Sequence, residues 1–243
     1  MLEFTMKSQK IINLNRLGDQ MKIDIFQHIA SEGPAAIGDW AEKNGDTLTI
    51  HKFYENEPVP SGHDLDFLVV LGGPMSVNDQ DKPWIAEERR CISEALAADV
   101  PVFGICLGAQ QLAKTLGAEV IAGVKEVGWY PITKTTRRLP CIPAVLTPLH
   151  WHGETFALPQ GAERLFSSEA CSNQGFIFRN KAIGLQFHLE ATKESVATLL
   201  ACDGAYLDQS PYVQSAEQIA AFTVPEENHK TLFQLLDGLR DPK

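Results

Sequence analysis

The sequence predicts an α/β fold of three layers (αβα), in which helices cover both faces of a mostly parallel central sheet. Three times in the first half of the chain, an apolar strand-like segment is followed by a helix-like one, which is typical of βαβ units. The segment 67–71 (FLVVL) is apolar throughout, as expected of a parallel strand that is buried on both faces. After Gly117 the pattern changes to short alternating segments, which we expect to add antiparallel strands to the same sheet.

The expected elements are bounded by turn and cap signals. Asn44-Gly45 is a helix stop, and Pro83 suits the first turn of a helix. We expect strands over residues 21–26, 47–51, 67–71, 100–105, 127–133, 145–149, 175–179 and 182–187, and helices over 33–43, 83–98, 110–116, 192–201 and 226–239. Residues 1–21 are polar and weakly patterned, so we expect an N-terminal extension there and a single domain over 22–243.

Composition narrows the possible partners and compartments. The 243 residues include 44% hydrophobic ones, as in an ordinary globular protein, and carry a net charge of −10. Because there is no long basic run, we expect no nucleic-acid partner and no anionic-membrane surface. The apolar runs are too short to span a bilayer, and the N-terminus has no apolar segment typical of a secretory signal.

The cysteines indicate a reduced compartment. Their number is odd, and they are scattered without C-x-x-C spacing, at positions 91, 106, 141, 171 and 202. This usage is typical of a cytoplasmic protein and argues against a structural zinc site. His150-x-His152 could supply two metal ligands from one face of a strand, but no third ligand with suitable spacing accompanies them. We therefore expect no metal.

Cys106 stands at the centre of a G-x-C-x-G motif, Gly104 to Gly108, between an apolar strand and a helix. This spacing is the thiol version of the nucleophile elbow, whose sharp turn leaves no room for side chains two residues before and after the nucleophile. The turn also places the sulfur at the N-terminus of the following helix, where the thiolate is favoured. On its own, the motif also fits a buried structural cysteine.

His188 and Glu190 form an H-x-E pair at the end of another apolar strand. Residues two apart on a strand project from the same face, so Glu190 can orient the imidazole of His188. The imidazole can then take the proton of Cys106 and return it to a leaving amine. A lone histidine is more often structural, but this pairing, in a chain with an elbow cysteine, favours catalysis.

Gly72-Gly73-Pro74 directly follows the buried strand 67–71. In a parallel sheet, ligands bind outside the carboxyl ends of the strands, where Cys106 also lies. The backbone N–H groups of Gly73 and Leu107 could therefore form an oxyanion hole, although a plain turn explains this sequence equally well.

Together, the segments 72–74 (GGP), 104–110 (GICLGAQ) and 186–190 (QFHLE) resemble the triad (class I) glutamine amidotransferases. The variants EVGWYP at 126–131 and HGE at 152–154 are similar to free-standing proteins related to the amidotransferase domain of GMP synthetase. The resemblance implies a flavodoxin-like fold without a cofactor and a triad of Cys106, His188 and Glu190. It further implies that Gln110 helps to bind glutamine and that Gly73 and Leu107 donate to the oxyanion. Two departures are Leu189, where many relatives have proline, and Glu154, where Asp is more usual.

Three functions are compatible with these motifs. The first is hydrolysis of glutamine to glutamate and ammonia through a thioester on Cys106, with the ammonia passing to a separate synthase subunit. The second is a free-standing hydrolase of γ-glutamyl peptides or γ-glutamyl amines, which would use the same triad. The third, less favoured because all the triad residues are present, is a non-catalytic regulatory subunit with the same fold.

Overall fold

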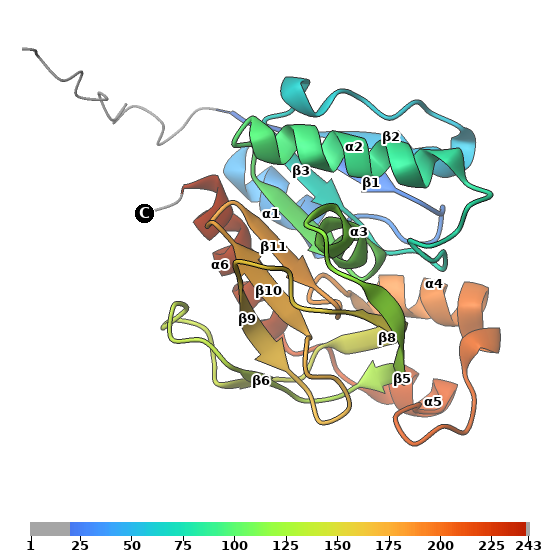
Figure 1. The fold of residues 1–243 in the computed structure, drawn as a ribbon. Helices are drawn as coiled ribbons and strands as arrows, with labels where there is room; N and C mark the ends of the chain where they lie inside the picture. Colours follow the sequence, from blue (N-terminus) through green and yellow to red (C-terminus); the bar gives the residue numbers. More distant parts are fainter. Residues whose placement is uncertain (1–19, 242–243) are drawn as a thin grey trace, which may run out of the picture.

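The computed structural model describes residues 20–241, so the extension expected over residues 1–21 lies almost wholly outside the described residues. The described part is built on a nine-stranded sheet in the order β2-β1-β3-β4-β11-β10-β9-β6-β7 (Figure 1). The strands β1 (Lys22–Gln27), β2 (Thr47–Lys52), β3 (Phe67–Val70), β4 (Val102–Ile105) and β11 (Ala182–Leu185) are parallel to one another. The carboxyl ends of these strands therefore meet at one edge of the sheet.

Antiparallel strands extend the sheet on the other side of β11. They are β10 (Gly175–Phe178), β9 (Ala162–Ser167), β6 (Ile132–Lys134) and β7 (Val145–Leu146). The predicted α/β class with added antiparallel strands is confirmed, although β9 was not expected from the sequence.

Helices cover both faces of the central sheet and complete the three predicted layers (Figure 1). On one face, α1 (Ala36–Asn44) and α6 (Glu226–Arg240) pack on alternate residues of β3, Phe67 and Val69. On the other face, α2 (Pro83–Ala97) and α3 (Leu107–Thr115) pack on Leu68 and Val70. Both faces of β3 are thus buried, which explains why this strand is apolar throughout.

A small second sheet corrects one expectation. The strands β5 (Val120–Trp129) and β8 (Leu149–Phe156) pair with each other and not with the central sheet. Each of the two strands predicted here is divided at a proline. The predicted strand 127–133 is divided at Pro131 into β5 and β6, and the predicted strand 145–149 is divided at Pro148 into β7 and β8. Proline cannot donate to a strand ladder, so the chain changes sheets at these positions.

The second sheet packs on the remaining helices, α4 (Lys193–Asp203) and the unpredicted α5 (Ala216–Ala221), and it forms a separate apolar cluster with them. Short 3-10 turns complete the structure over Phe53–Glu55, Gly62–Asp64 and Gly204–Tyr206. Among residues 20–241, no helix is both long and apolar enough to cross a membrane.

Candidate active site

Cys106 lies in a sharp turn between β4 and α3. Its backbone is left-handed, with φ of 50° and ψ of −107°, a conformation that is strained for a residue with a side chain. Neighbouring strand ends hold the turn in place, because the Cys106 N–H donates to the carbonyl of Leu185 at 2.8 Å and the Gly108 N–H donates to that of Leu71 at 3.1 Å. The predicted helix begins earlier than expected, at Leu107, so the sulfur lies at its very start.

The flanking glycines are required by close backbone contacts. A Cβ on Gly104 would lie 2.5 Å from the carbonyl oxygen of Gly108, and a Cβ on Gly108 would lie 2.0 Å from that of Val70 in β3. Both separations are far shorter than a carbon–oxygen contact allows. The G-x-C-x-G spacing is thus explained by the packing of α3 against β3 and β4.

His188 and Glu190 follow β11 rather than lying within it. Nδ1 of His188 is 2.6 Å from Oε1 of Glu190, while Phe187 and Leu189 point into the core. Burial opposes protonation of His188, but the charge of Glu190, the nearby thiol of Cys106 and the hydrogen bond to Glu190 raise its pKa well above the ordinary value. The ring is therefore arranged to hold a proton beside the sulfur.

The imidazole and the thiol occupy one small space. A Cβ on Gly72 would lie 3.2 Å from Cε1 of His188 and 3.6 Å from Cβ of Cys106, so only glycine leaves this space open. The sulfur also lies 3.6 Å from the carbonyl oxygen of Trp151 and 3.7 Å from the side-chain nitrogen of Gln186. Gln186 was part of the sequence motif, but its contact with the sulfur was not expected.

A pocket of about 340 Å³ opens beside Cys106 and His188, and Gly73 and Gln110 also line it. The side-chain nitrogen of Gln110 donates to the carbonyl of Glu154 and to Oε1 of Gln186, both at 3.3 Å. Leu107 packs its side chain in the core, while its N–H belongs to the first turn of α3, whose donors have no partner within the helix. The structure thus brings the predicted site residues to one place.

Several residues of the pocket were missed by the sequence reasoning: Glu32, Ser76, Asp203 and Tyr206. Glu32 follows β1 at the carboxyl edge of the sheet, so its position in the topology could have indicated it. Its pKa is raised, chiefly because burial penalises the carboxylate, with the charge of His188 acting in the opposite direction. Asp203 is held by Trp151, whose indole N–H donates to it at 2.7 Å.

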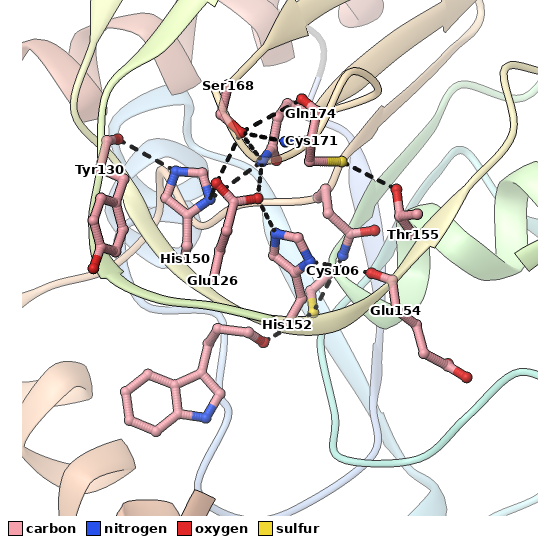
Figure 2. A network of polar contacts seen from close by, with 12 residues as sticks. Cys106, Glu126, Tyr130, His150, His152, Glu154, Thr155, Ser168, Cys171 and Gln174 are labelled. Carbon is pink, nitrogen blue, oxygen red and sulfur yellow. Dashed lines mark hydrogen bonds and ion pairs between the residues drawn. The ribbon is translucent and has the colours of Figure 1, made fainter. Parts of the chain in front are cut away.

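A network of buried polar side chains extends from the β5–β8 sheet to Ser168 and Gln174 (Figure 2). Glu126 pairs with His152 in the register of the two strands, and their side chains are 3.2 Å apart. Glu126, His150 and His152 offer donor atoms within 4.8 Å of one another, a set of types found at zinc sites. Glu126 is thus a third side chain of the metal-ligand type. The spacing of His150 and His152 in the sequence did not reveal it.

Hydrogen bonds occupy part of this network. The carboxylate of Glu126 accepts from Ser168 at 2.8 Å and from Gln174 at 2.7 Å. Burial lowers the pKa of His150 to about 3, so this ring is neutral. Nδ1 of His152 lies 3.1 Å from the carbonyl oxygen of Glu154, and its Nε2 lies 3.2 Å from Oε2 of Glu126. Among residues 20–241, Nε2 of His152 and Oε1 of Gln174 have no hydrogen-bond partner, so the network is only partly satisfied, and the absence of a metal stays a prediction.

Comparisons with known proteins agree with this geometry. The sequence model of the family "Glutamine amidotransferase class-I" matches residues 36–201. The glutamine amidotransferase-like protein YfeJ of Salmonella typhimurium is 34% identical over 90% of this chain and 97% of its own length. One of the subunits of the glutamine-hydrolysing GMP synthase of Archaeoglobus fulgidus is 33% identical over 57% of this chain and 74% of its own length.

A solved structure supports the same relationship. The glutamine amidotransferase of Methylobacillus flagellatus superposes with a TM-score of 0.82 at 30% identity, over 91% of this chain and 93% of that one. The family model spans the elbow, the Gly72-Gly73 loop and the His188–Glu190 pair, so the match includes every predicted site residue. This chain belongs to the class-I glutamine amidotransferase family.

Proposed function

We propose that this protein hydrolyses a γ-glutamyl amide, in the first place glutamine, through a thioester on Cys106. One observation carries the proposal: the strained Cys106 shares a pocket with His188, whose ring is hydrogen-bonded to Glu190 at 2.6 Å. A cysteine beside an oriented imidazole is the arrangement required for nucleophilic attack on an acyl carbon.

The reaction has two stages. The Cys106 sulfur attacks the γ-carbonyl carbon as a thiolate, and the proton on His188 passes to the leaving nitrogen, so that ammonia departs and a glutamyl thioester remains. In the second stage, His188 takes a proton from water, whose oxygen attacks the thioester. The C–S bond breaks, glutamate is released, and the Cys106 thiolate and the His188 ring, which keeps the proton taken from water, restore the starting pair.

The other predicted residues have supporting roles. The N–H groups of Gly73 and Leu107 are proposed to bind the oxyanion that forms in both stages. Gln110 is proposed to hold the amino-acid end of glutamine, because its side chain lines the pocket close to Glu154. No cofactor is required in these steps.

The fate of the ammonia follows from the relatives. One of them is named as a component of a glutamine-hydrolysing GMP synthase, which supports a separate synthase chain as the acceptor. We therefore propose that this chain delivers ammonia to a partner synthase.

A second candidate is the hydrolysis of γ-glutamyl amines or peptides, and the charge of the pocket favours it. Glu32, Glu154 and Asp203 line the pocket, whereas its described lining includes no lysine or arginine. Such an acidic wall would attract a leaving group that carries an ammonium. The same triad would perform the chemistry.

A comparison of substrates tests both candidates. Ammonia release from glutamine is measured beside amine release from γ-glutamyl dipeptides and γ-glutamyl diamines, with and without candidate synthases. Turnover of glutamine supports the amidotransferase. Inert glutamine with rapid cleavage of the diamine conjugates would replace it with the amine hydrolase, and inactivity with all of them would favour a regulatory subunit.

A further inference from the structure

His28 and Glu88 form a buried pair that the proposed reaction does not use. His28 follows β1, Glu88 belongs to α2, and neither side chain is exposed to solvent. Nε2 of His28 lies 2.7 Å from a carboxylate oxygen of Glu88, and Nδ1 lies 2.8 Å from the carbonyl oxygen of Gly72. The ring also stacks on Trp84, with a centroid distance of 5.1 Å, so its plane is fixed.

The hydrogen-bond partners determine the protonation of this ring. A carbonyl oxygen can only accept, so Nδ1 of His28 carries a proton and donates it to Gly72. Burial alone would lower the pKa of His28, but the charge of Glu88 and the hydrogen bonds to Glu88 and Gly72 outweigh it and raise the pKa. Nε2 lies within hydrogen-bond distance of the Glu88 carboxylate, which aligns the ring, and the raised pKa favours donation from both nitrogens.

The bond to Gly72 fixes the orientation of a whole peptide unit. The carbonyl of Gly72 and the N–H of Gly73 belong to the same planar trans peptide and point in opposite directions. A carbonyl held toward His28 thus turns the Gly73 N–H away from His28. Gly73 lines the pocket, and a Cβ on it would lie 3.1 Å from Cβ of His28 and 3.2 Å from Cδ2 of Leu107, whose backbone N–H is the other expected donor.

We infer that His28, aligned by Glu88, is a positioning residue that holds the Gly72–Gly73 peptide with its N–H toward the substrate carbonyl, so that the oxyanion hole is formed before substrate binds. The inference rests on the proposed function, because it assigns a support to the proposed oxyanion donor. We call the hydrogen bond from His28 to the Gly72 carbonyl the clamp. Without the clamp, a peptide between two glycines rotates at little steric cost. The donor would then be lost from part of the population.

The experiment compares variants of the full-length protein. His28→Leu removes the donor to Gly72, whereas His28→Asn keeps an N–H near the position of Nδ1. A matched control is His51→Leu. His51 lies on β2, outside the lining of the pocket, and its Nε2 is 2.8 Å from Oδ1 of Asp24. The measurements are kcat and KM for the best substrate, the rate at which iodoacetamide alkylates Cys106, and the orientation of the Gly72–Gly73 peptide in crystal structures.

If the clamp exists, His28→Leu should lower kcat but leave the rate of Cys106 alkylation unchanged. His28→Leu should lower kcat about 10- to 100-fold, part of the 10²–10³-fold typical of deleting an oxyanion donor, with KM changed by less than about threefold. Alkylation of Cys106 should keep its rate, because that reaction forms no oxyanion. His28→Asn should recover most of kcat, and His51→Leu should match the wild type. The peptide should be reversed or doubly oriented in His28→Leu only.

An unchanged kcat in His28→Leu would overturn the clamp, and so would a Gly72–Gly73 peptide that stays oriented as in the wild type. An equal loss of kcat and of alkylation would also contradict it, because it would indicate general damage to the site. Failure of the proposed function is distinct, since the wild type would then cleave none of the substrates. In that case the crystal structures of wild type and His28→Leu still decide whether the clamp exists.

Discussion

Nδ1 of His188 lies 2.6 Å from Oε1 of Glu190, although only Leu189 separates the two residues in the chain. This contact fixes the ring and leaves Nε2 for the sulfur of Cys106. It is also one of the causes of the raised pKa of His188. The pair therefore controls both the direction and the charge of the proposed acid.

Glu190→Gln should narrow the pH range of activity. His188 must be protonated to donate to the leaving amine, so activity is lost as pH rises through its raised pKa. Removing the charge of Glu190 lowers that pKa, and the alkaline limb of the kcat/KM profile should move to lower pH. We also expect a fall in kcat of at least about tenfold. An alkaline limb at the wild-type position would show that Glu190 is not the partner that sets the charge of His188.

Cys106→Ala should abolish turnover and covalent labelling by a diazo-ketone analogue of glutamine. Intact-mass measurement of the wild type should show a single adduct, carried by the peptide that contains Cys106. The matched control is Cys171→Ala, because Cys171 is also buried but lies outside the pocket, and burial raises the pKa of its thiol. Persistent labelling of Cys106→Ala would contradict the assignment of the nucleophile.

Gly108→Ala should destabilise the fold, because its Cβ would overlap the carbonyl oxygen of Val70 at 2.0 Å. Forced overpacking of this kind costs about 1–3 kcal/mol. Gly38→Ala is the control: Gly38 lies inside α1, and a Cβ added there would have nothing within 4 Å, so alanine should raise stability by about 0.5–1 kcal/mol. Urea unfolding of both variants measures the difference. Equal stabilities would show that the elbow is not tightly packed.

Chelation should leave the enzyme unchanged. The carboxylate of Glu126 accepts hydrogen bonds from Ser168 and Gln174, and none of the proposed steps uses a metal ion, so we expect neither the reaction nor the fold to need one. Protein dialysed against EDTA should keep its kcat and its melting temperature. A loss of either that added Zn²⁺ restores would mean that Glu126, His150 and His152 bind a metal.

The parts of the site that could be predicted from sequence depend on local geometry. The elbow requires glycine two positions before and two positions after Cys106, and the His188–Glu190 pair spans three residues. Short sequence motifs therefore reveal both. Gly73 could be placed because it lies three residues after the end of β3, at the carboxyl edge of a parallel sheet.

The remaining contacts depend on tertiary packing. Glu126 meets His152 only through the pairing of β5 with β8, whose register shifts between Ala122 and Glu126. His28 meets Glu88 across 60 residues of sequence, because α2 packs over the end of β1. No short motif contains such a pair. The separate β5–β8 sheet was missed for a related reason, since strand alternation does not say which sheet a strand joins.

The central claim is that Cys106 carries a glutamyl group during turnover. The direct test is rapid acid quenching of the enzyme with glutamine and, separately, with a γ-glutamyl amine, followed by intact-mass and peptide analysis. We predict one added glutamyl group on the Cys106 peptide in the wild type, accumulating further in variants with slowed hydrolysis of the thioester, and none in Cys106→Ala. Turnover of either substrate without any adduct, or with an adduct on another residue, would contradict the mechanism.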